Sequence, residues 1–463
     1  MESGSGGSRV EGRGLQRAGS RTTALAVLIA GLARLVGAQF SPAGPDFQVN
    51  TLATGRQWYA SVGADTEGNF VVVWESEGSD GTDSSSASVQ ARRFRADGLP
   101  LGPQFQVNTF TTGEQWEPEV AVDGQCGFVV VWESEGSGDT DTSGWSVHAR
   151  RYGADGQALG DEFQVNTYTT NDQRFPAVAA DALGNFLVAW QSHGSSGPDS
   201  TDWSIQARRF GADGSPLGSE FQVNTYTTNF QRLPSIDVNS QGLFVIGWQS
   251  SGSNGGDTSS RSIQARRFSA NGAPLDAQFQ VNTFTTGDQM APAVAIDDQG
   301  HLVVAWQSLG SFESDTDAWS IQARRFDASG SPVGPERQIN TYTTSYQLKP
   351  TVATEGGGRF LVAWQSYGSG GGDVSGYSVQ ARRLDAAGSP FGDEFQLNSS
   401  TMDDQARPAL AADDPGNFVV VWQSESSSGP DADGYSVQAR RFDALFRDGF
   451  ETGGTARWTA TTG

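Results

Sequence analysis

The sequence predicts an all-β fold: a seven-bladed β-propeller of four-stranded antiparallel blades, closed by the N-terminal strand, which completes the last blade. Three observations predict it. A tryptophan recurs seven times at a spacing of 58 residues, each repeat contains four short strand-like runs, and the repeats follow one another without linkers. A fixed period of this length indicates a repeat architecture rather than several unrelated domains. The recurring tryptophans are Trp74, Trp132, Trp190, Trp248, Trp306, Trp364 and Trp422.

The repeat that starts at Phe163 illustrates the four expected strands. Its apolar or alternating runs are short enough to be strands. Turn-forming residues separate them, at 182–185 (ALGN) and at Asp213-Gly214, where Gly or Asn accepts a positive φ. The expected strands are residues 176–181 (PAVAAD), 186–192 (FLVAWQS), 204–210 (SIQARRF) and 220–225 (EFQVNT).

The two ends of the repeat array favour a closed ring over an open stack or a string of small sandwiches. Residues 46–51 (DFQVNT) match a fourth strand with no preceding three, and residues 436–442 (SVQARRF) match a third strand with no fourth. The first of these segments can therefore complete the last blade and leave no unpaired edge. Separate sandwiches are disfavoured because a four-stranded unit of this size buries little surface by itself.

Strand direction sorts the loops onto two faces. We call one the long-loop face, because it receives the loops between second and third strands, such as 194–203 (GSSGPDSTDW), and the linkers between repeats, such as 167–173 (TYTTNDQ). The opposite face receives only tight Gly-rich turns. Function concentrates in long loops on a rigid frame, so we expect a ligand on the long-loop face.

Composition excludes several classes of function. The chain has a net charge of −23 and Lys349 is its only lysine, which makes nucleic acid and anionic membranes poor partners. The single cysteine, Cys126, excludes a disulfide framework and a cysteine-based metal site. His148, His193 and His301 occupy three non-equivalent positions of the repeat, which argues against a histidine-dependent active site. Calcium and neutral polar ligands stay open.

The termini predict export. Residues 1–38 combine a basic region, a short apolar run and small residues, which is typical of a secretory signal peptide; an uncleaved anchor is the alternative, because the basic region is long. We therefore divide the chain into a signal peptide (1–38), the propeller (39–445) and a tail (446–463). The mature protein is expected to be secreted or on the cell surface, not inserted into a membrane, and monomeric.

Some polar residues recur in every repeat. The arginine pairs, such as Arg208-Arg209, lie near the end of the third strand, on the same side as recurring carboxylates such as Asp181. We expect one arginine of each pair to bind this carboxylate through its planar fork, with a phosphate-binding ring as the alternative. Glutamines such as Gln173 stand just before the innermost strand, where seven identical blade junctions require seven identical hydrogen bonds. A structural role is favoured for these glutamines, and for the tryptophans as apolar filler between blades.

Candidate ligand-binding residues lie where the repeats differ or where aromatics stand near the mouth of the channel. The residue after each recurring glutamine varies, and exposed Trp and Arg are typical of binding surfaces; the candidates there are Trp58, Trp116, Arg174 and Arg232. A second series of aromatics precedes the third strands and can either stack on sugar rings or pack on the strand start; it comprises Trp145, Trp203, Trp319, Tyr377 and Tyr435.

The long loops carry pairs of aspartates that suit calcium, which takes several hard oxygen ligands from flexible loops. Their spacing does not match a helix-loop-helix calcium motif, and such loops are commonly only solvated. The candidate metal ligands are Asp139, Asp141, Asp315, Asp317, Asp431 and Asp433. No singular acid-base pair, nucleophile elbow, phosphate loop or histidine set marks a catalytic site.

The string FQVNTYTTNDQ…PAVAADALGNFLVAWQS…SIQARRFGADGSPLGSEFQVNT resembles repeats of large secreted and surface proteins of bacteria. The resemblance covers about residues 47–444 and implies an exported propeller-like module, without catalytic residues to carry over. The tail 446–458 (FRDGFETGGTARW) resembles the DGFE-type segment that ends many exported proteins of Gram-negative bacteria.

These observations together predict an exported, non-catalytic binding module for a glycan or an extracellular protein, with its site on the long-loop face around the channel mouth. A secreted glycosidase or lyase on the same scaffold is the first alternative. A structural surface or matrix protein is the second.

Overall fold

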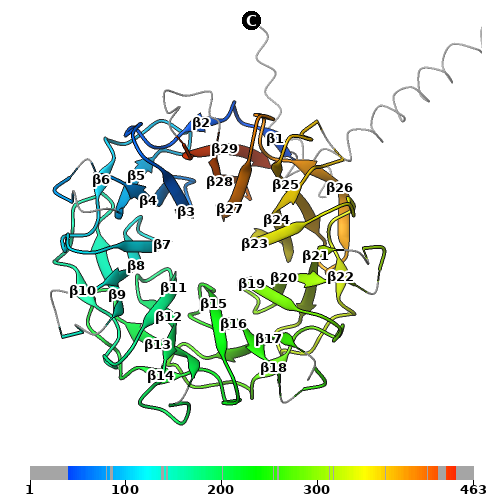
Figure 1. The fold of residues 1–463 in the computed structure, drawn as a ribbon, viewed down its shortest axis with the longest axis horizontal. Coiled ribbons are helices and arrows are strands. Elements are labelled where there is room, and N and C mark those ends of the chain that lie inside the picture. Colours follow the sequence, from blue (N-terminus) through cyan, green and yellow to red (C-terminus); the bar gives the residue numbers. More distant parts are fainter. Residues whose placement is uncertain are drawn as a thin grey trace, which may run out of the picture.

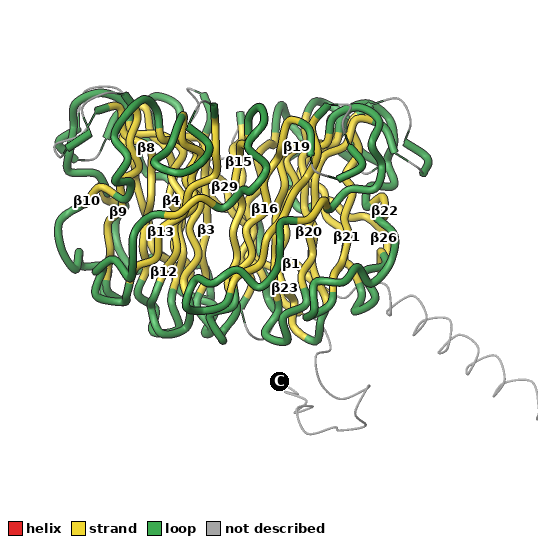
Figure 2. The backbone as a smooth tube through the Cα atoms, turned by 90° about the horizontal axis from the view of Figure 1, so that it is seen from below, coloured by secondary structure: helices red, strands yellow, loops and turns green. Residues whose placement is uncertain are grey.

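The computed structural model describes residues 40–444 except 80, 84–86, 137–139, 142–143, 201, 254, 258–259, 312, 316–317, 371, 414–415 and 426–433. In this part the chain is entirely β, and seven antiparallel sheets are arranged around a central channel (Figure 1). Seen from the side, the inner strands run along the channel and the loops gather at its two ends (Figure 2). The predicted fold class, a seven-bladed β-propeller, is confirmed.

Each blade runs from an inner first strand to an outer fourth strand, and we number the blades in chain order. The first strands are β3 (Gln57–Ala64), β7 (Gln115–Val122), β11 (Gln173–Ala180), β15 (Gln231–Val238), β19 (Gln289–Ile296), β23 (Gln347–Gly356) and β27 (Gln405–Ala412). The second strands are β4 (Phe70–Glu77), β8 (Phe128–Glu135), β12 (Phe186–His193), β16 (Phe244–Ser251), β20 (Leu302–Leu309), β24 (Arg359–Tyr367) and β28 (Phe418–Ser424).

The third strands are β5 (Ala87–Phe94), β9 (Trp145–Tyr152), β13 (Trp203–Phe210), β17 (Arg261–Phe268), β21 (Trp319–Phe326), β25 (Tyr377–Leu384) and β29 (Ser436–Ala444). The fourth strands are short: β6 (Phe105–Gln106), β10 (Phe163–Gln164), β14 (Phe221–Gln222), β18 (Phe279–Gln280), β22 (Arg337–Gln338), β26 (Pro390–Gln396) and, for the seventh blade, β2 (Phe47–Gln48). One further strand, β1 (Phe40–Pro42), also pairs with β29.

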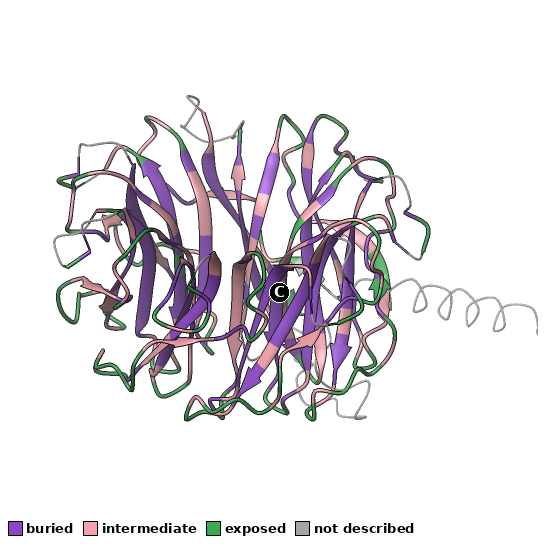
Figure 3. Cartoon of the chain, turned by 60° about the horizontal axis from the view of Figure 1, so that its bottom comes forward, coloured by how far each residue is buried: buried purple, intermediate pink, exposed green. Residues whose placement is uncertain are grey.

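Buried residues are concentrated in the strands, whereas the loops are mostly exposed (Figure 3). The core lies between the blades rather than inside any one of them. Val71 and Val89 of the first blade, for example, belong to the same buried cluster as Phe128 and Trp132 of the second blade. The second strands are covered by a blade on each face, so they need apolar residues on both faces. All seven recurring tryptophans are at most 1% exposed, which confirms their structural role.

The ring closes as the sequence predicts. Phe47 pairs with Ala439 and Gln48 with Gln438, so β2 completes the seventh blade. The Val49 amide donates to the Val437 carbonyl at 2.8 Å and extends this pairing. Both chain-terminal segments of the array therefore share one sheet, which leaves no open blade edge at the junction.

The arginine pairs tie neighbouring blades together, but mainly through backbone carbonyls. The first arginine of each pair donates to the carbonyl of the residue that follows the outer strand of the preceding blade, at 2.7–3.0 Å; these arginines are Arg92, Arg150, Arg208, Arg266, Arg324, Arg382 and Arg440. The expected bridge to the first-strand carboxylate forms in the sixth blade, where Arg383 Nε lies 2.8 Å from Glu355. As a general rule of the repeat this prediction is wrong. The Asp65 carboxylate, for instance, already accepts the Glu67 and Asn69 amides of its own hairpin at 2.9 Å.

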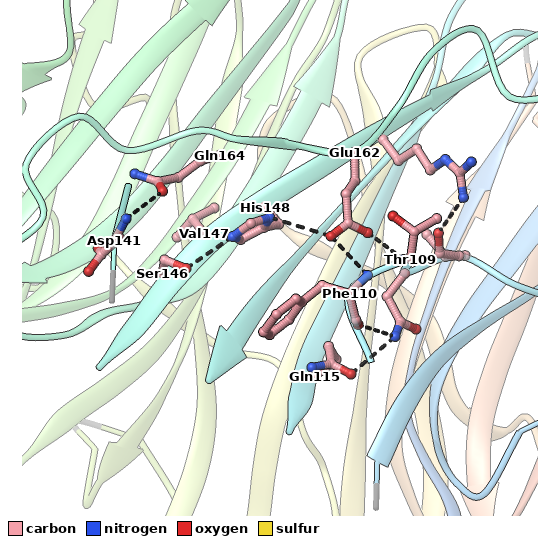
Figure 4. A network of polar contacts seen from close by, with 12 residues as sticks. Thr109, Phe110, Gln115, Asp141, Ser146, Val147, His148, Glu162 and Gln164 are labelled. Atoms are coloured by element: carbon pink, nitrogen blue, oxygen red, sulfur yellow. Dashed lines mark hydrogen bonds and ion pairs between the residues drawn. The ribbon is translucent and has the colours of Figure 1, made fainter. Parts of the chain in front are cut away.

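Acidic or amide side chains before the fourth strands add a second tie between blades (Figure 4). Glu162 of the second blade accepts the amides of Thr109 and Phe110 from the preceding blade, the latter at 3.1 Å. His148 is buried beside it, with Nδ1 3.9 Å from the Glu162 carboxylate and Nε2 3.0 Å from the Ser146 hydroxyl. This histidine therefore belongs to the frame.

The predicted signal peptide (1–38) and tail (446–463) lie outside the described residues, so both boundaries stay predictions. The described residues include no helix long and apolar enough to cross a membrane.

Candidate ligand-binding site in the central channel

A bulge near the start of every first strand aims one side chain of each blade into the channel. In the first blade Trp58 pairs with Glu75 and Ser61 with Val73, so Tyr59 and Ala60 together stand opposite the single Trp74. Such a bulge bends the strand and redirects a side chain. The equivalent residues all have φ between 50° and 53°, in the left-handed region; they are Tyr59, Glu117, Phe175, Leu233, Ala291, Lys349 and Arg407. We call these seven residues the channel ring.

The preceding blade holds most of the bulges in place. For five ring residues, the side-chain oxygen of the residue after the recurring tryptophan accepts the backbone amide of the ring residue in the next blade. Gln365 accepts the Arg407 amide at 2.9 Å, and Glu133 accepts the Phe175 amide at 3.0 Å. Because this bond uses only the backbone of the ring residue, the ring side chain is free to differ from blade to blade.

The channel ring is divided into a polar and an apolar arc. In blade order, Lys349, Arg407, Tyr59 and Glu117 are neighbours, and Phe175, Leu233 and Ala291 complete the circle. All seven line a cavity of about 520 Å³ whose wall is built from the first strands of all seven blades. This volume lies within the usual range of small-molecule sites, about 300–1,000 Å³.

Two cations stand side by side in the polar arc. The Arg407 guanidinium donates to the Tyr59 hydroxyl at 3.1 Å and lies 4.0 Å from the centre of the Tyr59 ring. In the described part of the chain, neither Lys349 nor Arg407 forms an ion pair with a carboxylate. Desolvation by the surrounding strands, and then the charge of Arg407, lower the pKa of Lys349.

Four carboxyl groups around the channel have raised pKa values. Desolvation raises the pKa of Glu117 to about 8, with a further contribution from the charge of Glu133. Desolvation likewise raises the pKa of Glu75, behind the ring, to about 8. Deeper in the channel, enclosure raises the pKa of Glu119 and of Asp237 to about 7. Glu117 and Glu75 are therefore mainly protonated at neutral pH and can donate hydrogen bonds.

The variable residues singled out from the sequence lie one position before the ring and do not line the cavity. The structure brings some of them together in a stack between blades: the rings of Trp116 and Trp145 are 4.7 Å apart, and the Arg174 guanidinium lies 4.4 Å from the Trp145 ring. Arg174 also binds Glu133 through two nitrogens, at 2.7 and 3.1 Å. This cluster is held by its own contacts.

The other mouth candidates form smaller groups. Arg232 lies over the Trp203 ring at 5.0 Å, and the Trp58 indole N–H donates to the Glu75 carboxylate. Tyr377 contacts Tyr367, with the ring centres 5.2 Å apart. Trp319 pairs with Leu309, and the Tyr435 carbonyl accepts the Gln57 amide at 2.8 Å. All nine candidates are half-buried. We call them the rim residues, and a ligand role for them stays a prediction.

The two candidate calcium ligands that fall in the described part are buried and bonded to the frame. The Asp141 carboxylate accepts a hydrogen bond from the side-chain amide of Asn166 at 3.0 Å, and the Asp315 carboxylate accepts one from the side-chain amide of Asn340 at 3.1 Å. The other four candidates, Asp139, Asp317, Asp431 and Asp433, lie outside the described residues. Among the residues that are described, no group of three or more His, Cys, Asp or Glu is arranged to hold a metal ion. Calcium binding stays a prediction.

The channel ring lies one position after the variable residues that the sequence placed around the mouth. The signal was present, since the second residue after each recurring glutamine is the most variable of the strand and includes the only lysine of the chain. The bulge decides which of two adjacent variable positions faces the channel, and regular strand alternation does not reveal it.

Comparisons with known proteins support the fold. No protein-family model matches the chain, and the search of curated proteins finds no match. Among solved structures, a protein of unknown function from Dyadobacter fermentans is similar with a TM-score of 0.52 at 10% identity, covering 88% of this chain and 100% of that chain. The polysaccharide lyase Uly1 is similar with a TM-score of 0.49 at 11% identity, covering 86% and 91%. The NanB sialidase from Streptococcus pneumoniae has a TM-score of 0.47 at 9% identity, covering 87% and 71%. At these identities the likeness concerns the fold alone.

Proposed function

We propose that this protein is an exported binding module whose ligand enters the channel from the long-loop face and contacts the channel ring. One observation carries the proposal: the ring is where seven otherwise similar blades present seven different side chains to one cavity. The positions that hold the blades together repeat, because each blade needs the same contacts. Positions that face the cavity are under no such requirement, so their divergence is what a specific ligand site needs.

The dimensions and chemistry of the cavity favour a glycan over a folded protein. A volume of about 520 Å³ accommodates a small ligand or the end of a chain, whereas a protein surface cannot enter it. Hydroxyl and carboxyl groups from Tyr59, Glu117 and Glu119 line one side of the cavity, and Phe175 offers an aromatic face on the other. The half-buried aromatics of the rim, Trp145 among them, are suited to contact further sugar units outside the channel.

A glycan array on the mature protein tests the proposal. Phe175→Ala removes the aromatic face of the ring and should lower the affinity for any bound glycan about tenfold or more. Trp58→Ala combined with Trp116→Ala removes two rim aromatics and should lower the affinity only for ligands that extend beyond the channel. Leu183→Ala, at an exposed hairpin residue on the opposite face, is the matched control. Loss of binding in the control, or full binding in Phe175→Ala, would contradict the placement of the site.

A glycosidase or lyase on this scaffold is the second candidate, and Glu117 is the observation that favours it. A carboxyl group with a pKa of about 8 stays protonated at neutral pH, as a general acid must, and it neighbours Tyr59 in the ring. Turnover of a polysaccharide that disappears in Glu117→Gln would establish this activity. If neither binding nor turnover is found on a broad glycan panel, the structural or matrix role predicted as the last alternative is the better account.

A further inference from the structure

The charge of the channel ring contrasts with that of the whole chain. The protein carries a net charge of −23, yet the polar arc places its only lysine next to Arg407. The backbone amides of both residues are pinned by the preceding blades, at 3.0 Å for Lys349 and 2.9 Å for Arg407. Two cations are thus held at adjacent positions of an enclosed channel, and neither forms an ion pair in the described part of the chain.

The neighbouring acids do not neutralise this pair at neutral pH. Glu117 is the carboxyl group whose charge acts on both cations, but burial keeps it mainly protonated below about pH 8. The two cations stand close enough to repel one another: desolvation is the main cause of the lowered pKa of Lys349, and the charge of Arg407 lowers it further. An anion placed between them would relieve this repulsion and gain charge-assisted hydrogen bonds from both.

The rest of the cavity indicates what the anion is attached to. Next to the cations stand groups that donate and accept hydrogen bonds, namely the Tyr59 hydroxyl and the protonated Glu117. Two residues further along the same strand as Tyr59, Ser61 donates to Glu119 at 2.6 Å. Across the channel stands the apolar arc, with the ring of Phe175. A ligand that matches all three surfaces carries an anionic group, several hydroxyls and one apolar face.

We propose that the channel ring binds a sugar that bears a carboxylate, with the carboxylate between Lys349 and Arg407, hydroxyls toward Tyr59 and Glu117, and the apolar face of the sugar against Phe175. This inference rests on the proposed function and names the ligand class for the same site. Arg407 is the main anchor, because its free guanidinium nitrogens can bind a carboxylate through two parallel hydrogen bonds while the group stays bonded to Tyr59.

Isothermal titration with matched sugar pairs tests the proposal. Glucuronic, galacturonic and N-acetylneuraminic acid are compared with glucose, galactose and N-acetylmannosamine, and phenylpropionate serves as a carboxylate without hydroxyls. We expect at least one sugar acid to bind about tenfold or more tighter than its neutral counterpart. Arg407→Gln and Lys349→Gln should each lower this affinity about tenfold, and Arg407→Lys should lower it less.

Arg95→Gln is the matched control, since it removes one positive charge from an exposed turn on the opposite face. Circular dichroism and thermal melting of each variant establish that the blades stay folded. The inference is overturned, while the proposed function stands, if neutral sugars bind as tightly as sugar acids. Equal binding of phenylpropionate would overturn the sugar part of the inference. If no sugar of either kind binds, the proposed function fails together with it.

Discussion

Glu75 gives the sharpest test of the electrostatics around the channel. It is 3% exposed and follows the recurring tryptophan of the first blade, where five other blades carry glutamine: Gln191, Gln249, Gln307, Gln365 and Gln423. Glu75→Gln therefore introduces a side chain that the same site already accommodates elsewhere in the ring. The variant keeps an oxygen for the indole N–H of Trp58 and removes the titratable group.

The magnitude follows from the pKa of Glu75, which burial raises from 4.5 to about 8. Because the folded-state pKa lies above the unfolded one, the native state holds its proton more tightly, and the stability present below about pH 4.5 is lost as the pH rises to about 8. At 1.36 kcal/mol for each pH unit, the rise of this pKa from 4.5 to about 8 corresponds to on the order of 5 kcal/mol. With an unfolding entropy of about 2.1 cal/mol/K per residue over about 400 residues, this equals a shift of about 6 °C in the thermal midpoint.

Differential scanning calorimetry at pH 5, 7 and 9 measures the effect. The thermal midpoint of Glu75→Gln relative to the native protein should rise with pH and reach its largest excess at pH 9. Gln191→Glu, the reverse change in the third blade, should show the opposite trend, and Glu67→Gln at an exposed hairpin should show none. A difference between Glu75→Gln and the native protein that is the same at pH 5 and pH 9 would refute the assigned pKa and its cause.

Three further predictions concern the channel and the core. Reductive methylation with ¹³C-formaldehyde labels only Lys349 and the N-terminal amine. NMR titration should show Lys349 losing its proton below pH 10.5, and Arg407→Gln should move that transition to higher pH. A transition that Arg407→Gln leaves unchanged would contradict the proximity of the two cations. The affinity for a sugar acid should fall as the pH rises through about 8, because ionised Glu117 then competes for the cations, and this fall should disappear in Glu117→Gln as measured by titration calorimetry. Trp190→Ala should lower the free energy of unfolding by about 3–5 kcal/mol, because a fully buried ring is lost between two blades; a loss below about 1 kcal/mol in calorimetry would contradict its role as filler.

The fold was predictable because every feature of the blade occurs seven times in the sequence. A single tryptophan indicates little about the fold, whereas seven tryptophans at a fixed spacing, each within a strand-like run, indicate a repeated blade. The closure by residues 46–51 was predictable for the same reason, since those residues match a strand whose place in the blade is known from the other copies. In the structure Phe47 pairs with Ala439 as this reasoning requires.

The residues that face the channel were predictable only to within one position. Sequence reasoning placed variable residues such as Trp58 at the channel mouth, whereas the bulge turns the following residue, Tyr59, into the channel. A bulge depends on which backbone groups pair across two strands, and the residues here give no glycine signal for the left-handed conformation. The hydrogen bonds from the arginines to backbone carbonyls could not be predicted either. Every residue has a backbone carbonyl, so the sequence does not indicate which one accepts such a bond.

The closure of the ring also has a consequence for how the chain folds. The Val437 amide donates to the Asn50 side chain across 387 residues, while most other hydrogen bonds between blades join residues at most 62 apart. Six blades can form from nearby segments in succession, but the seventh needs both extremities of the array. The entropy cost of closing a loop grows only with the logarithm of its length. Once the other blades have formed, they bring the two ends of the array close together, so the entropy cost of this last step is small. Until then the incomplete ring exposes one apolar sheet face of its first blade and one of its last blade, and these two faces bury each other only when the circle is complete.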